Sequence, residues 1–210
     1  MSALQEKLNA ARDAGNILES TCENASNLLA SSDNPVIHSA VEELVDGEHW
    51  SELNDRFFRT LAFGTGGLRG RSVGRVVTSA ERGSAAEGER PEHPCVGTNA
   101  MNFFNLSRAM QGMVSFLHQF QKESGADGKP SMSFAHDTRH FSREFAEFCA
   151  KVATDLGVDA YLFETPVATP ELSFSVRHLG ASAGVVITAS HNPSHDNGFK
   201  ASFSDGAQLI

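Results

Sequence analysis

The sequence predicts an α/β fold: a three-layer α/β/α domain with a mostly parallel, mixed sheet, preceded by an N-terminal helical extension. From residue 98 onward, stretches with helical spacing alternate with short strand-like runs, which is typical of helices that connect parallel strands. Near the N-terminus the apolar residues show helical spacing alone. These observations place the helical extension at residues 1–58 and the α/β domain at residues 59–210.

The extension begins with a helical arm that covers residues 1 to about 33. Ser2 and Gln5 have the spacing of a capping box, which favours a helix start at this point. Asn34 should end the arm, because Pro35 disfavours a helical conformation at the residue before it.

A second helical stretch runs from about residue 37 to 58, and the pair Asp46-Gly47 should divide it into two short helices. Residues 71–97 mix Gly, Ser, Pro and charged residues without periodicity. They therefore predict a long exposed loop.

The alternating pattern begins with a helix from Thr98 or Asn99 to about residue 120, since either polar residue can cap a helix. A strand is expected at 131–137. Ser142 should then cap a second helix that Gly157 ends, because glycine is favoured just after the last helical residue.

A further strand is expected at 158–164, and Thr169-Pro170-Glu171 supplies a cap, a proline at the first helical position and a first-turn carboxylate. That helix should end at Gly180. Residues 184–188 form a short continuous apolar run, as expected for a strand buried on both faces. Ligands of such sheets bind beyond the carboxyl ends of the strands, so the residues after Thr188 are the first candidates for a site.

Composition excludes several classes of function. The chain has 17 basic and 26 acidic side chains, and a net charge of −9 argues against sequence-independent binding to nucleic acid. No apolar run is long enough for a membrane span, and the N-terminus has no signal-peptide pattern. Cys22, Cys95 and Cys149 are far apart and form no C-x-x-C pair, so we expect free thiols in the reducing cytoplasm.

Polar residues suited to catalysis follow the apolar run directly, in the segments Thr188–Pro193 and Asn197–Lys200. A serine at the carboxyl end of a strand exposes its hydroxyl over the sheet edge, and neighbouring His, Asn and Lys supply a proton carrier, a hydrogen-bond donor and a positive charge. The same residues also suit a plain Asx-rich turn between two strands, with Pro193 and Gly198 as turn residues. The residue types alone leave both interpretations open.

The order of these residues resembles the phosphoserine loop of the α-D-phosphohexomutases, in which TASHNP is followed, ten residues after its serine, by the lysine of NGFK. The segment FGTGGLRG at 63–70 resembles the start of domain I of the same enzymes. The segment AHDTR at 135–139 is similar to their G-x-D-x-R, with Ala-His in place of the usual pair. The three motifs occur in the family order over residues 61–210. The N-terminal helical segment and the residues of FGTGGLRG are most similar to the phosphoglucomutase/phosphopentomutase branch.

The resemblance implies a role for five residues. Ser190 would be the residue that carries the phosphate, with His191 and Lys200 as proton carriers and phosphate-orienting groups. Arg69 would contact phosphate through its guanidinium, although a solvated loop charge is the alternative. Thr65 and the glycines beside it would let the backbone approach the site.

The resemblance also implies an isomerase that interconverts sugar 1- and 6-phosphates, or pentose 1- and 5-phosphates, through a bisphosphate intermediate that also serves as activator. Mg²⁺ would be held by the phosphate on Ser190 and by a D-G-D-x-D-R loop of a second domain. The Asp-Gly pairs at residues 46, 127 and 205 do not match that loop. We therefore expect domains 2–4 to be missing partners of this chain, and the chain alone to be inactive.

A different class of function is a catalytically incomplete, stand-alone domain that acts as a binding or interaction module. A D-G-D-x-D-R loop encoded downstream of residue 210 would favour the enzyme, and a natural stop after Ile210 would favour the module. The identity of the sugar, whether glucose, mannose, a pentose or an amino sugar, stays open because the specificity loop of the family lies in another domain.

Overall fold

The computed structural model describes residues 2–64, 66–125 and 128–209. These residues form two compact units. The first combines Met1–Ala62 with Gly70–Asn102, and the second combines Phe63–Arg69 with Phe103–Ile210. The limits of these units differ from the domain boundary that we predict between residues 58 and 59. That boundary stays a prediction.

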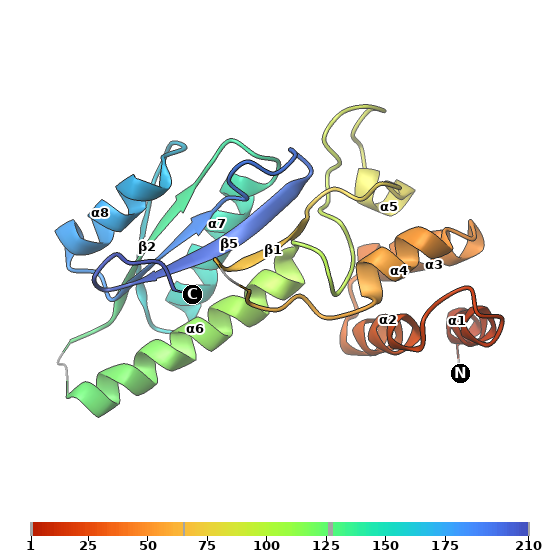
Figure 1. Cartoon of the computed structure of the whole chain (residues 1–210), viewed down its shortest axis with the longest axis horizontal. Coiled ribbons are helices and arrows are strands. Elements are labelled where there is room, and N and C mark those ends of the chain that lie inside the picture. The colour runs from red at the N-terminus through yellow and green to blue at the C-terminus, as the bar shows by residue number, and fades with distance from the viewer. Residues whose placement is uncertain (1, 65, 126–127, 210) are drawn as a thin grey trace. The chain divides into compact units, whose positions relative to one another are not determined.

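The first unit is helical (Figure 1). Its helices are α1 (Ala3–Asp13), α2 (Glu19–Ser31), α3 (Pro35–Asp46), α4 (Trp50–Phe57) and the single turn α5 (Ser79–Arg82). Ser2 caps α1 by accepting a hydrogen bond from the backbone N–H of Gln5 at 3.3 Å. The expected division at Asp46-Gly47 is confirmed, because α3 ends at Asp46 and α4 begins at Trp50.

The helical arm expected over residues 1 to 33 is wrong in one respect, since it consists of two helices. Gly15 has a φ of +75°, and its N–H donates to the carbonyl of Arg12 at 2.8 Å. The N–H of Asn16 donates to the carbonyl of Ala11 at 2.9 Å. These bonds use carbonyls that a continuing helix would need, so α1 ends here.

The expectation of an exposed loop over 71–97 is also wrong in part. Glu81 of α5 is 1% exposed, and its carboxylate accepts from Arg56 Nη1 at 2.5 Å and from the backbone N–H of Val96 at 2.7 Å. Glu52 completes the group by accepting from Arg56 Nε at 2.9 Å. Charged residues are buried when each is paired, and here the pairing ties the segment to α4.

The second unit carries the sheet, in the order β1-β5-β4-β2-β3. Its elements are β1 (Leu68–Arg71, which continues into the first unit), α6 (Phe103–Ser124), β2 (Ser131–His136), α7 (Ser142–Asp155), β3 (Asp159–Leu162), α8 (Thr169–Leu179), β4 (Ala183–Ile187) and β5 (Asp196–Phe203). Strand β2 pairs in parallel with β3 and β4, and β5 pairs antiparallel with β4. The prediction of a three-layer α/β/α domain with a mixed sheet is confirmed.

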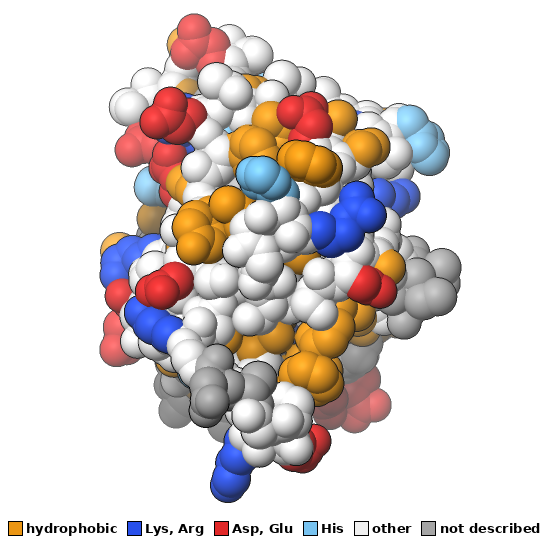
Figure 2. Space-filling view, turned by 90° about the vertical axis from the view of Figure 1, so that its left-hand side faces the viewer, with side chains coloured by type: hydrophobic (Ala, Val, Ile, Leu, Met, Phe, Trp, Pro, Cys, Tyr) orange, Lys and Arg blue, Asp and Glu red, His pale blue; other side chains and the backbone are white. Residues whose placement is uncertain are grey.

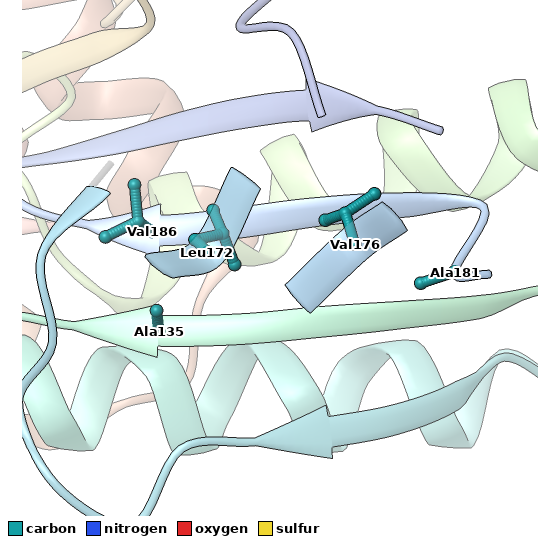
Figure 3. Packing of buried hydrophobic residues seen from close by; sticks show 5 residues of the cluster. All are labelled: Ala135, Leu172, Val176, Ala181 and Val186. Carbon is teal, nitrogen blue, oxygen red and sulfur yellow. The ribbon is translucent and has the colours of Figure 1, made fainter. Parts of the chain in front are cut away.

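Helices cover the two faces of this sheet. Helix α8 packs on β2 and β4 through a cluster that contains Leu172, Val176, Ala135 and Val186, with α6 and α7 behind the strands (Figure 3). A Cβ added at Gly184 of β4 would lie 2.5 Å from Val176 Cγ2, so a glycine here permits the close approach of α8. On the opposite face, the Phe103 ring of α6 contacts the Phe145 ring of α7 with a centroid distance of 5.2 Å.

Three expected helix starts are shifted. Helix α6 begins at Phe103, because Thr98 donates its hydroxyl proton to the Arg59 carbonyl at 2.7 Å instead of capping a helix. Ser142 is the first residue of α7 and donates to Asp137 Oδ1 at 2.6 Å. Helix α8 has Ala168 at its N-cap, one residue before the expected position.

The outer surface of the second unit bears several exposed hydrophobic residues, including Phe174 and Leu179 of α8 and Tyr161 of β3. On the side shown in Figure 2, hydrophobic side chains lie in separate groups among polar and charged ones. No helix in the described part of the chain is long and apolar enough to cross a membrane.

The cysteines Cys22, Cys95 and Cys149 are free and buried. Burial raises the pKa of the Cys95 thiol to about 12 and also raises the pKa of Cys149. Because thiol reagents attack the thiolate, we expect Cys95 and Cys149 to react at pH 8 only when the protein opens. Peptide mapping after labelling with and without denaturant measures this. Labelling of both cysteines in native protein at the rate of a free thiol would contradict it.

Candidate active site

The loop that links β4 to β5 contains Ser190, whose side chain is exposed at the carboxyl end of β4. Ser190 has a φ of +58°, in the left-handed region that costs a residue with a side chain about 1–2 kcal/mol. Its backbone N–H donates to Thr188 Oγ1 at 3.0 Å, and the N–H of Asn192 donates to the Ala189 carbonyl at 3.1 Å. Such a conformation persists only where surrounding contacts impose it.

Of the two other predicted catalytic residues in this region, His191 contacts this serine, whereas Lys200 makes no hydrogen bond to it among the described residues. The Nδ1 atom of His191 is 3.4 Å from Ser190 Oγ, within reach of a weak hydrogen bond. Lys200 lies on β5, opposite Val186 of β4, and its side chain is half-buried. Among the residues that the structure describes, the Lys200 ammonium has no hydrogen-bond or ion-pair partner. A cation without a protein partner beside a strand end is suited to an anionic ligand.

Arg69 approaches the loop from a distant part of the sequence. It lies on β1, next to β5 in the sheet, and its Nη1 donates to Asn192 Oδ1 at 3.1 Å. The amide nitrogen of Asn192 in turn donates to Asp196 Oδ2 at 2.9 Å. The structure therefore brings Arg69 to the Ser190 loop, while its binding of phosphate stays a prediction.

In the FGTGGLRG segment, Thr65 lies outside the described residues, so its role in the site stays a prediction. Gly67 has a φ of +112°, and a Cβ added to it would lie 2.2 Å from the carbonyl oxygen of Phe199 on β5. This glycine therefore serves the close approach of two backbone segments within the protein. Gly66, with a φ of +95°, would meet only the end of the Gln208 side chain, at 3.2 Å.

These two glycines form a matched pair for a stability measurement. Gly66→Ala should lower the free energy of unfolding by about 1–2 kcal/mol through backbone strain alone. Gly67→Ala should cost about 1–3 kcal/mol more, because its methyl group also overlaps the Phe199 carbonyl. Urea denaturation measures both values, and equal losses for the two variants would refute the close approach.

A residue without a role in the sequence-based prediction also reaches the loop. Arg139 follows β2, and its guanidinium donates to the backbone carbonyls of Ser190, Asn192 and Pro193 at 2.6, 2.7 and 2.6 Å. The carboxylate of Asp137 lies 3.2 Å from Arg139 Nε. The signal available in the sequence was the segment AHDTR itself, but the bonds join residues more than 50 positions apart.

The described residues do not form a complete site for Mg²⁺. The ion requires near-octahedral oxygen ligands, and no group of three or more His, Cys, Asp or Glu residues in the described ranges could hold a metal. Ser190 contributes one hydroxyl, and a phosphate on it would add oxygens of the kind that Mg²⁺ prefers.

Comparisons with known proteins agree on one family. Residues 93–210 match the family model of phosphoglucomutase/phosphomannomutase, α/β/α domain I. Phosphoglucomutase of Staphylococcus epidermidis (strain ATCC 12228) is 34% identical over 171 residues, covering 81% of this chain and 26% of that protein. Phosphoglucomutase of Staphylococcus aureus (strain bovine RF122) is 33% identical over the same shares. The chain thus spans about a quarter of the length of these curated relatives.

A solved structure supports the same grouping. A Thermus thermophilus protein assigned as a phosphomannomutase superposes with a TM-score of 0.53 and 28% sequence identity. The similarity covers 72% of this chain and 28% of that one. It extends over more than half of the present chain, so it concerns the fold as well as a local motif.

Proposed function

The chain belongs to the phosphoglucomutase/phosphomannomutase family, and on that premise we propose that it is the N-terminal part of an enzyme that moves a phosphoryl group between two positions of a sugar phosphate. The positions are the 1- and 6-hydroxyls of a hexose, or the 1- and 5-hydroxyls of a pentose. The observation that carries the proposal is the exposed Ser190 hydroxyl at the end of β4, with His191 Nδ1 at 3.4 Å and Arg69 bonded to the same loop.

The chemistry uses Ser190 as a phosphoryl carrier. In the first half-reaction the P–O bond to Ser190 Oγ breaks and a sugar hydroxyl forms the new P–O bond. The proton of that hydroxyl passes through a proton carrier to Ser190 Oγ, and the second half-reaction returns it. The resulting sugar bisphosphate then returns its other phosphoryl group to Ser190 Oγ, which leaves the isomeric monophosphate. Added sugar bisphosphate acts as activator because it phosphorylates Ser190 in enzyme molecules that have lost this phosphate.

The cations Arg69 and Lys200 and the imidazole of His191 support this chemistry. A transferring phosphoryl group spreads negative charge over its equatorial oxygens, which fixed cations stabilise. Arg69 offers a planar fork of donors and Lys200 a point charge, so both suit a phosphate. The imidazole of His191 can pass a proton to or from the oxygen that enters or leaves.

Mg²⁺ would neutralise charge on the phosphate when bound. In this proposal the phosphate on Ser190 contributes to its coordination, and the remaining ligands come from a second domain that this chain does not contain. Three further domains would complete the sugar site. The partners are therefore the sugar phosphate and the rest of the same polypeptide.

Phosphorylation of Ser190 tests the proposal directly. The enzyme that contains this chain is incubated with glucose 1,6-bisphosphate and Mg²⁺, and tandem mass spectrometry locates the phosphate. We expect phosphoserine at residue 190. If that phosphate is labelled with ³²P, a chase with unlabelled glucose 1-phosphate should move the label to the sugar phosphate, because each cycle gives the Ser190 phosphoryl group to the sugar and takes back the other one. Phosphate on another residue, or none in an enzyme that turns over, would overturn the proposal.

The 210-residue chain alone should show no measurable turnover. Its described residues do not hold Mg²⁺ by themselves, and its match to the relatives covers only 26% of their length. A coupled assay with glucose 1-phosphate, glucose 1,6-bisphosphate and Mg²⁺ measures this, with the whole enzyme as control. Clear turnover by the chain alone would show that it contains a complete site.

A further inference from the structure

Arg139 makes a set of contacts that the proposed chemistry does not use. Its two terminal nitrogens donate to the carbonyl oxygens of Ser190, Asn192 and Pro193, and Nη1 also lies 3.2 Å from the Asp196 carbonyl oxygen. Three of the four acceptors belong to the loop that links β4 to β5, and the fourth, Asp196, is the first residue of β5. A guanidinium has donors in a fixed plane, so these bonds define where the carbonyls lie relative to each other.

The loop requires such a support. Four carbonyl oxygens that converge on one place repel each other unless a cation lies between them. Ser190 in addition has a φ of +58°. Backbone groups within the loop bond to each other from the Asn192 N–H to Ala189 and from the Asp196 N–H to Pro193, at 3.1 and 3.0 Å. Neither of these two bonds involves Ser190 itself. The Ser190 N–H donates to Thr188 Oγ1 at 3.0 Å, and the Ser190 carbonyl is held by Arg139, so the two bonds together fix both peptide groups of this residue.

Asp137 holds Arg139 in place. Its Oδ2 lies 3.2 Å from Arg139 Nε, and its Oδ1 accepts from the Arg139 backbone N–H at 2.9 Å and from the Ser142 hydroxyl at 2.6 Å. The Arg139 side chain is only 12% exposed. The Ser142 oxygen accepts in turn from Asn197 Nδ2 at 2.9 Å. One carboxylate thus anchors contacts to the loop, through Arg139, and to the start of β5, through Ser142 and Asn197.

We propose that Arg139 is a positioning residue for phosphoryl transfer: by holding these four carbonyls, it keeps Ser190 in the conformation that presents its hydroxyl at the sheet edge. The functional part of this inference rests on the proposed role of Ser190, whereas the effect on the loop itself does not. Lysine should replace Arg139 only in part, because a single ammonium has three donors and no fixed plane.

Hydrogen exchange tests the effect on the loop without any assay of activity. In the enzyme that contains this chain, Arg139→Ala should speed amide exchange in peptides covering residues 188–197 by about tenfold or more, while peptides from α8 are unchanged. Arg143→Ala is the matched control. That arginine lies on α7 and contacts Glu147 at 2.8 Å and the Glu164 carbonyl at 3.0 Å, both outside the loop. Equal loop exchange in wild type and Arg139→Ala would overturn the proposal.

Kinetics test the effect on Ser190. Arg139→Ala should lower kcat and the rate of Ser190 phosphorylation by about 100-fold, with a change in KM below about threefold, because misplacement of a reacting group by about 1 Å has that consequence. Millimolar guanidinium ion should restore part of the rate in Arg139→Ala and none in Ser190→Ala. A faster-exchanging loop with unchanged kcat would refute the positioning role.

The hydrogen-exchange and kinetic measurements distinguish a failure of this inference from a failure of the proposed function. Absence of phosphate on wild-type Ser190 would refute the carrier role and with it the positioning role in catalysis, while loop exchange would still decide whether Arg139 holds the loop. If Arg139→Ala does not fold, Arg139→Lys takes its place. It retains the charge and should show an intermediate exchange rate and an intermediate kcat, and wild-type values in both measurements would contradict the proposal.

Discussion

Replacing Ser190 with alanine should reduce mutase turnover of the enzyme that contains this chain by at least about 1,000-fold, because the atom that carries the phosphoryl group is removed. The fold should persist. The Ser190 side chain is exposed, and its hydroxyl contacts only the neighbouring His191, at 3.4 Å, among the described residues. A coupled assay for glucose 6-phosphate measures the loss, and thermal unfolding measures the stability.

Ser194 provides the control for this experiment. It is an exposed serine of the same loop, four residues away, and has no predicted role. Ser194→Ala should retain turnover within about twofold of wild type, as expected for a surface substitution. If Ser190→Ala kept more than a few per cent of wild-type turnover at unchanged stability, the assignment of Ser190 as the carrier would have to be abandoned.

Removal of either candidate phosphate-binding cation should have the next largest effect. Arg69→Ala and Lys200→Ala should each lower kcat/KM by about 10- to 1,000-fold through the loss of one charge-assisted contact. Arg69 also bonds to Asn192 at 3.1 Å, so its removal can loosen the loop as well. Arg69→Lys should recover only part of the activity, because the planar fork is lost.

Controls for these variants remove the same charge elsewhere. Lys151→Ala breaks an exposed i,i+4 pair with Asp155 on α7, and Arg143→Ala breaks one with Glu147. Exposed pairs of this kind contribute little to stability, so both controls should keep wild-type kinetics. Steady-state kinetics over a range of glucose 1-phosphate concentrations provide the comparison. Near-wild-type kcat/KM in both test variants would show that these cations do not bind the transferring phosphate.

The fold was predictable where a local pattern decides it. The continuous apolar run expected as a strand at 184–188 is β4 at Ala183–Ile187, since such a run between a glycine and polar residues has few alternatives. Strand β1 was missed, and a strand after the serine loop was considered only as part of the turn alternative. β1 continues the glycine-rich FGTGGLRG segment, and β5 begins with Asp-Asn-Gly, so both resemble turns when the sequence is considered alone.

The sequence predicts only those parts of the site whose residues are close together in the chain. Ser190 and His191 are adjacent in the sequence and also lie together in the structure. The bonds of Arg139 to the loop, and the buried pairing of Arg56 with Glu81, join residues 51 and 25 positions apart. No periodicity or spacing shows such contacts, because they depend on how complete elements pack.

The buried group of Glu52, Arg56 and Glu81 restricts how this chain can change by mutation. Loss of Arg56 alone would leave two carboxylates facing each other without a cation, and removal of one partner from a buried pair typically costs about 3–5 kcal/mol. Replacement of all three by well-packed apolar residues can be neutral or even stabilising. A single substitution at any of the three positions should therefore be strongly destabilising, whereas a joint exchange of all three can be tolerated. The three positions should change together in evolution. Any chain that differs from this one at residue 56 should also differ at residues 52 and 81.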